Sequence, residues 1–240
     1  MDPFAPRSWD DVGEDGTFGN RFDDPGALRN IGTARRFRTI YCATERVAAF
    51  AEVVARMRPS IRLLDQLAEV DDEDEPLDDV FAGVVDPEFP AHGLITHDWR
   101  LRRRVGKIAL DPALRFVDLD DPENIDLLRR ELAPLLRVRK MDLDLSTLVS
   151  GDRALTQAIA RFVYEQQADD GHPMFAGIRY VSRLSASWEC WAVFDSGLHG
   201  DKGLPETVHP DDPGLLEAAR VFQLTIEGPT RGHYLRPWQG

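Results

Sequence analysis

The segment FRTIYCATERVAAFAE, residues Phe37 to Glu52, combines a short strand with a helix and anchors our interpretation of the chain. The strand is expected over residues 38–42, and Thr44 then offers a hydroxyl that can cap the first turn of the helix. Glu52 lies on the flank of the apolar face of that helix, which leaves it able to face a binding site. The face itself is defined by apolar residues at helical spacing: Val47, Phe50, Ala51, Val54 and Ala55.

Further elements follow from local signals along the chain. Asp121 followed by Pro122 indicates the start of a helix that runs to about Leu132. Residues 152–167 carry a strong helical stripe, and residues 215–222 fit either a helix or a strand. Strands are predicted by alternating apolar residues in five segments: residues 104–110, 115–119, 177–182, 188–194 and 222–226.

These elements predict one compact α+β domain, with a small mixed or antiparallel sheet and flanking helices. We place the domain at residues 19–226, after an irregular lead-in over residues 1–18 that is rich in Asp, Gly and Pro. An acidic insertion is expected at about residues 63–90, and residues 227–240 read as an irregular tail. The insertion contains the run DDEDE, which favours a solvated loop over a surface for a basic partner.

Composition narrows the classes of function. The 240 residues carry a formal net charge of −13, which argues against a direct nucleic-acid ligand because phosphate binding needs a basic patch. No apolar run approaches the roughly 20 residues of a membrane helix, and the N-terminus shows no secretory signal. We therefore expect a cytoplasmic protein without membrane contact. Cys42 and Cys190 are expected to be buried free thiols.

Motifs of metal and nucleotide enzymes are missing from the sequence. His97-Asp98 has no further ligand at metal-binding spacing, so we expect no metal cofactor. The glycine-rich stretch at residues 13–19 follows no predicted strand and is not a dinucleotide fingerprint. Neither a Walker phosphate loop nor a Gly-x-Ser-x-Gly elbow occurs.

Four scattered residues need a closer look: Arg21, Tyr41, Glu52 and Ser182. Each has a plain structural explanation when it is taken alone. Arg21 can pair with the aspartates that follow it, and Tyr41 can be a core aromatic with its hydroxyl at the surface. Glu52 can form an i,i+4 surface pair, and Ser182 can close a turn.

Taken together and in order, the segments that hold these residues resemble the RES-domain family, which is named for signature Arg, Glu and Ser residues. The resemblance spans most of residues 19–194. It rests on four stretches: GNRFDDP (19–25), FRTIYCATERVAAFAEV (37–53), ALTQAIARFVYEQ (154–166) and GIRYVSRLSASWECWAVF (177–194). It implies a fold related to ADP-ribosyltransferase toxins, with NAD⁺ bound in a cleft.

The resemblance also implies site residues. Arg21, Glu52 and Ser182 match the signature arginine, glutamate and serine, and Tyr41 matches an aromatic position of the family's site. Ser185 and Ser187 stay open as alternatives to Ser182. The residue types suit the chemistry of NAD⁺, because an arginine fork binds pyrophosphate and an aromatic face holds the cationic nicotinamide ring. A carboxylate can stabilise an oxocarbenium-like ribose, and a serine hydroxyl can orient the substrate.

The sequence therefore predicts an NAD⁺-consuming enzyme of the toxin type, which cleaves the nicotinamide–ribose bond as a glycohydrolase or a phosphorylase. A protein ADP-ribosyltransferase of the same fold is the first alternative. A partner-binding protein with a RES-like scaffold and no turnover is the second. The resemblance implies an antitoxin partner with an Xre-type helix-turn-helix domain, which would make any DNA contact itself. A homodimer is also compatible with the sequence.

Overall fold

The computed structural model describes residues 2–26, 30–58 and 93–228, and these residues form an α+β structure. The chain divides into two compact units, which we describe separately. The first contains residues 50–105 and 206–240, and the second contains residues 2–49 and 106–205. No helix in the described part of the chain is long and apolar enough to cross a membrane.

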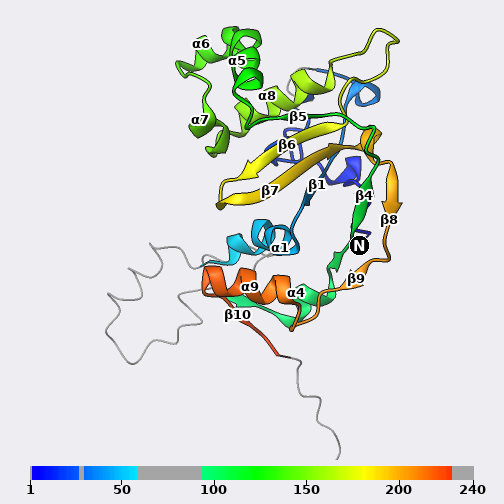
Figure 1. The fold of residues 1–240 in the computed structure, drawn as a ribbon, viewed down its shortest axis with the longest axis vertical. Helices are drawn as coiled ribbons and strands as arrows, with labels where there is room; N and C mark the ends of the chain where they lie inside the picture. Colours follow the sequence, from blue (N-terminus) through cyan, green and yellow to red (C-terminus); the bar gives the residue numbers. More distant parts are fainter. Residues whose placement is uncertain (1, 27–29, 59–92, 229–240) are drawn as a thin grey trace, which may run out of the picture. The chain divides into compact units, whose positions relative to one another are not determined.

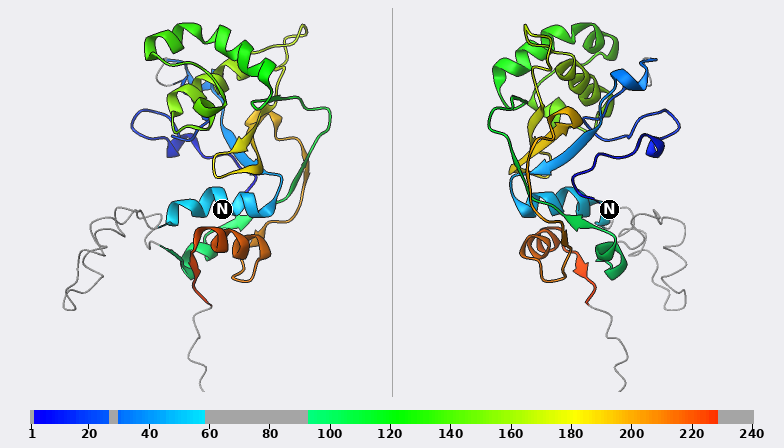
Figure 2. Two further views of the ribbon diagram at one scale, coloured as in Figure 1. Left: turned by 60° about the vertical axis from the view of Figure 1, so that its left-hand side comes forward. Right: turned by 90° about the vertical axis from the view of Figure 1, so that its right-hand side faces the viewer.

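The second unit is built on a four-stranded sheet in the order β1-β7-β6-β5 (Figure 1). β1 and β6 each pair with β7 in antiparallel fashion, whereas β5 pairs with β6 in parallel. Both views of Figure 2 show β1, in light blue, running beside β7. The predicted mixed sheet is therefore confirmed. Its strands are β1 (Thr39–Ala43), β5 (Phe116–Asp118), β6 (Gly177–Ser182) and β7 (Ser185–Phe194).

Helices cover one face of this sheet. The longest of them, α8, lies against β6 and buries Leu155, Ile159 and Val163 in the same apolar core as Ile178 and Ala192 of the sheet (Figure 1). Aspartate side chains accept hydrogen bonds from the first turns of three of these helices, which offsets the unpaired N–H groups there. The helices are α5 (Pro122–Glu131), α6 (Ala133–Arg139), α7 (Leu145–Val149) and α8 (Arg153–Tyr164).

Shorter elements complete the second unit. β4 pairs with β8 in antiparallel fashion. Gly200 of β8 has φ +152°, and a Cβ atom there would lie 2.0 Å from the carbonyl oxygen of Ala109, so this close strand contact requires glycine. The elements are η1 (Trp9–Asp11), η3 (Thr33–Arg35), β4 (Ile108–Leu110), η5 (Asp195–Gly197) and β8 (Gly200–Lys202).

The first unit contains two small two-stranded sheets and short helices. β10 pairs with β2 in parallel, and β3 pairs with β9 in antiparallel fashion. Helix α1 (Arg46–Val54) follows β1 along the chain, and the boundary between the units falls within it. The other elements are η4 (Ala55–Met57), β2 (Leu94–Ile95), α4 (His97–Leu101), β3 (Arg104–Val105), β9 (Glu206–Thr207), α9 (Pro213–Phe222) and β10 (Thr225–Ile226).

Most of the sequence-based elements are confirmed, with bounds shifted by at most three residues. The helices predicted from Asp121 and Asp152 begin directly after those residues, and residues 215–222 form a helix. The strand expected over residues 104–110 is wrong as a single element, because β3 and β4 are separate strands with different partners. The expected acidic insertion, at about residues 63–90, lies outside the described residues.

Two local predictions need correction. Thr44 does not cap α1, which begins at Arg46; its hydroxyl instead donates to Glu189 at 2.5 Å and accepts from the indole N–H of Trp191. Both cysteines are free, as predicted, but only Cys190 is fully buried, whereas Cys42 is partly exposed. Burial nevertheless raises the pKa of the Cys42 thiol to about 11.

A buried carboxylate organises the chain before β1. Asp24 is fully buried and accepts hydrogen bonds from the backbone N–H groups of Gly26 and Phe37, at 2.8 and 3.3 Å. Its charge is balanced by Arg36, whose Nε lies 3.0 Å away, and by Arg161 of α8 at 3.6 Å. The segment after residue 24 is thereby tied both to the start of the sheet and to its covering helix.

We expect Asp24→Asn to destabilise the protein by about 3–5 kcal/mol, because it leaves the buried Arg36 without its counter-charge and removes one of the two carboxylates near Arg161. Urea unfolding measures this loss. Asp126→Asn is the matched control, since Asp126 forms an exposed ion pair with Arg130 and its loss should cost less than about 1 kcal/mol. Equal effects of the two changes would show that the buried cluster is not a stability determinant.

Candidate functional site

The loop that carries Arg21 is fixed onto β1 by side chains of that strand. The Tyr41 hydroxyl accepts from the backbone N–H of Phe22 and donates to Asp23, both at 2.9 Å. The Thr39 hydroxyl donates to the carbonyl of Phe22 at 2.9 Å. Phe22 is fully buried in the core, so the backbone on either side of it, including Arg21, has a defined place over β1.

Arg21 lies between aromatic rings and a helix. Its guanidinium carbon is 5.1 Å from the ring centroids of both Phe22 and Tyr180, a distance typical of cation–π contact. Its Nη2 donates to the carbonyl of Leu148 in α7 at 2.5 Å. Nε and Nη1 of the same side chain are buried. Protein groups therefore hold the guanidinium in the position that the structure describes.

Tyr41 and Asp23 form a hydrogen-bonded pair beside Arg21. Asp23 is 2% exposed and also accepts from the backbone N–H of Asn20 at 2.7 Å. Burial raises the pKa of Asp23 above its ordinary value. Burial of the hydroxyl, followed by the charge of Asp23, raises the pKa of Tyr41. The Tyr41 side chain remains 36% exposed, so an accessible ring carries an inward-facing hydroxyl, the reverse of the core aromatic considered from the sequence.

Ser182 ends β6 and is buried. Its hydroxyl accepts from the backbone N–H of Leu184 at 3.0 Å, within the two-residue turn to β7. This contact matches the plain structural explanation for a serine at that position. The alternatives, Ser185 and Ser187, lie on β7, where their hydroxyls contact each other at 2.9 Å.

Strand register places three of the four predicted residues on one face of the sheet. Tyr41 pairs with Ala192, and Ala192 pairs with Ile178, so all three share a face. Tyr180 follows Ile178 at an alternate position and faces the same way. The register with β7 shifts between Val181 and Ser182, and Ser182, at the next alternate position of β6, is buried as Tyr180 is. Arg21 contacts this face through the ring of Tyr180. Arg21, Tyr41 and Ser182 are therefore gathered on the helix-covered face of the second unit.

Glu52 belongs to the first unit, on the part of α1 that follows the boundary. Within the helix, Ala48, Ala51 and Val54 are buried, Val53 is 39% exposed, and Glu52 is intermediate. The expected flank position of Glu52 is therefore confirmed. Its approach to the other three residues stays a prediction.

Two residues that help to position Arg21 were not predicted from the sequence. Tyr180 contacts Arg21 and Phe22, and it was considered only as one of several aromatics in a strand. Gln157 of α8 donates to the carbonyl of Asn20 at 3.0 Å and holds the Arg21 loop from the helix side. Alternation from Ser182 would have placed Tyr180 on the correct face, whereas a single buried glutamine gives no such signal.

The opposite face of the sheet carries an ion-pair network. Arg179 of β6 contacts Asp118, Asp120 and Glu189 at 2.7, 3.0 and 2.7 Å. Glu189 also accepts from the Thr44 hydroxyl, and this bond, followed by the one from Arg179, lowers the pKa of Glu189. Because folding lowers this pKa, Glu189 stabilises the folded protein at pH values above the pKa that the group has in the unfolded chain. This contribution is lost as the pH falls through the lowered pKa of the folded state. The network connects three strands with the residues just before α1.

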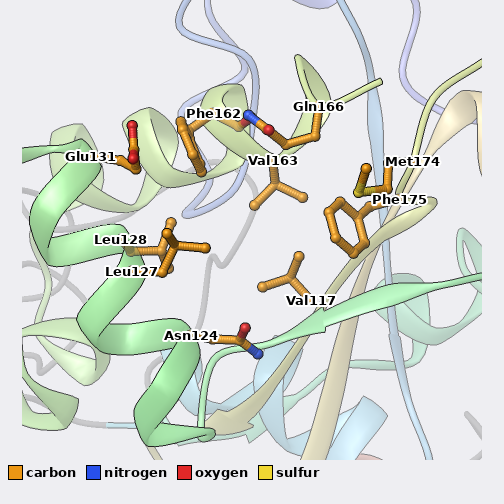
Figure 3. Close-up of a pocket in the computed structure, with 10 residues that line it drawn as sticks. All are labelled: Val117, Asn124, Leu127, Leu128, Glu131, Phe162, Val163, Gln166, Met174 and Phe175. Atoms are coloured by element: carbon orange, nitrogen blue, oxygen red, sulfur yellow. The ribbon is translucent and has the colours of Figure 1, made fainter. Parts of the chain in front are cut away.

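A pocket of about 420 Å³ lies elsewhere in the second unit, between α5, α8 and β5, and Arg21, Tyr41, Glu52 and Ser182 do not line it (Figure 3). Among the described residues, no group of three or more His, Cys, Asp or Glu side chains is placed to bind a metal ion. No family model, no curated protein and no solved structure matches the chain.

We expect Tyr41→Phe to cost about 1–3 kcal/mol at pH 7, because the buried N–H of Phe22 loses its acceptor. Since folding raises the pKa of Tyr41, the unfolded chain ionises first, and wild type loses stability as the pH rises above about 10. The variant lacks this loss, so the two proteins should converge in alkaline solution. Urea unfolding at pH 7 and pH 10.5 measures the difference, and a constant gap would contradict the assignment.

Proposed function

We propose that this protein is an NAD⁺-consuming enzyme of the RES type, with a fold related to ADP-ribosyltransferases, that acts as the toxin of a toxin–antitoxin pair. The observation that carries the proposal is the gathering of Arg21, Tyr41 and Ser182 on one sheet face. These residues come from segments up to 161 positions apart in a sequence of 240 residues. The resemblance implies all three as site residues, and their convergence on one face therefore supports the proposal.

In the proposed reaction, the bond between nicotinamide and ribose breaks, and the electron pair leaves with nicotinamide. The ring is cationic in NAD⁺ and neutral after cleavage, so departure needs no proton. The ribose becomes oxocarbenium-like, and Glu52 stabilises its positive charge. Water attack gives ADP-ribose and one proton, whereas attack by inorganic phosphate gives the corresponding ADP-ribose phosphate.

The other residues bind and orient the substrate. The exposed ring of Tyr41 offers a surface for the cationic nicotinamide, and Ser182 orients the amide or the ribose. Arg21 binds the pyrophosphate through its fork. Because its Nη2 is bonded to the Leu148 carbonyl, we expect this side chain to exchange that bond for a phosphate oxygen when NAD⁺ binds.

We expect the purified protein to deplete NAD⁺ and Glu52→Gln to lower kcat by about 100-fold, a typical loss for one transition-state contact. Glu45→Gln is the matched control, since Glu45 is exposed at the start of α1 and should leave the rate unchanged. Chromatography of the products with and without phosphate separates hydrolysis from phosphorolysis. Labelled NAD⁺ tests the alternative, protein ADP-ribosylation, because label would then remain on protein. Intact NAD⁺ under all these conditions would refute the enzymatic proposal.

Arg21→Lys keeps the charge but loses the two-pronged donor, so we expect the KM for NAD⁺ to rise about tenfold with little change in kcat. Arg183→Lys, at an exposed position in the β6–β7 turn, is the control. Initial rates over a range of NAD⁺ concentrations measure both constants, and circular dichroism checks the fold. A fall in kcat at unchanged KM would place Arg21 outside the pyrophosphate site.

A second candidate function is partner binding without turnover, with the antitoxin as the partner. The observation that favours it is the engagement of Arg21 by Leu148 and two aromatic rings, which keeps the guanidinium away from a ligand. The net charge of −13 suits a basic arm on a helix-turn-helix antitoxin under either function. Absence of NAD⁺ binding in calorimetry, together with tight antitoxin binding, would favour this candidate over the enzyme.

A further inference from the structure

The pocket between α5, α8 and β5 has walls that are mainly apolar. Val117 of β5 lies at its base, Leu127 and Leu128 of α5 form one side, and Phe162, Val163 and Phe175 form the other (Figure 3). Leu127 is 43% exposed although it is a large apolar residue. The volume of about 420 Å³ falls within the range of small-molecule sites in proteins. A ligand here needs an apolar body about the size of one or two fused rings.

The polar groups of the pocket present acceptor oxygens that the protein itself does not use. The amide nitrogen of Asn124 donates to the carbonyl of Asp118, and that of Gln166 donates to the carbonyl of Phe162, both at 2.9 Å. These bonds fix which end of each amide is oxygen, and in Figure 3 the oxygen of Asn124 turns toward the space between the helices. Glu131 adds a carboxylate to the lining. Within the described part of the chain, this carboxylate and both amide oxygens have no hydrogen-bond partner.

We propose that this pocket binds a small organic cation, an apolar ring system that ends in a protonated amine. The apolar walls accept the ring, and the acceptors at Asn124, Glu131 and Gln166 receive N–H donors. An ammonium group is the matching partner for a set with one negative charge and acceptor oxygens that no protein donor occupies. An anionic ligand of the same shape would be repelled by the charge of Glu131.

This inference is independent of the proposed NAD⁺ chemistry. The pocket shares no lining residue with Arg21, Tyr41, Glu52 and Ser182. Val117 and Tyr41 stand on the two edge strands of the sheet, β5 and β1, which are separated by three strand spacings, roughly 14 Å. Either assignment can therefore fail without the other.

Calorimetry and ligand-observed NMR with two probes test the proposal on the full-length protein. Tryptamine carries an indole ring and an ammonium group, whereas indole-3-propionate carries the same ring and a carboxylate. We expect tryptamine to bind saturably in the millimolar range or tighter, and indole-3-propionate to bind at least tenfold more weakly. Absence of saturable tryptamine binding, or equal binding of the two probes, would overturn the proposal.

Three variants locate the site. Glu131→Gln should weaken tryptamine binding about fivefold, and Glu123→Gln is its control, because Glu123 lies on the same helix outside the pocket. Leu127→Trp changes a half-exposed position and should abolish binding by filling the space, without altering charge. If binding survives in Leu127→Trp, or if the two glutamate variants behave alike, the ligand lies elsewhere and the proposal is wrong.

Discussion

A fully buried carboxylate must be neutralised where it lies, and Asp24 meets this constraint by drawing distant parts of the chain together. Its partners are Arg36, three residues before the start of β1, and Arg161 on α8. The loop that carries Arg21 is therefore connected to the sheet by electrostatic as well as apolar contacts. With Asp24 fixed, Phe22 is held in the core and Asp23 is held against Tyr41. These contacts fix the backbone beside Arg21, and the contacts of its guanidinium with Leu148 and Tyr180 then fix the side chain.

The sheet separates two kinds of polar chemistry by strand alternation. Odd-numbered residues of β6 and β7, such as Arg179 and Glu189, face one side and form an ion-pair network with Asp118. Even-numbered residues of β6, such as Tyr180 and Ser182, face the helix-covered side. The network also reaches Thr44, so the junction between β1 and α1 is set by the face opposite Tyr41. A single strand, β1, thus receives structural contacts from both faces.

Local signals were sufficient to predict much of the fold. Aspartate caps, proline positions and apolar spacing gave the starts of α5 and α8, because these features act within a few residues. The helix that begins at Ala133 was missed, since Pro134 was read as a disturbance although proline is tolerated in a first turn. Thr44 was misassigned because a nearby carboxylate on β7 outcompeted the helix end for its hydroxyl. That competition depends on strand pairing, which no local pattern contains.

The candidate site was predictable only in part, for a related reason. The resemblance selected Arg21, Tyr41 and Ser182, but it could not reveal the contacts that hold them, because Tyr180, Gln157 and Asp23 act through the tertiary structure. The pocket at β5 was not predicted at all, since its acceptors come from α5 and from Gln166, just after the end of α8, and only the tertiary structure brings these segments together. The separation of roughly 14 Å between the edge strands exceeds the range over which substitutions usually couple. The effects of a change at Tyr41 and a change at Glu131 on the free energy of unfolding should therefore add in the double variant. A coupling between them would mean that the helix layer above the sheet moves as one body.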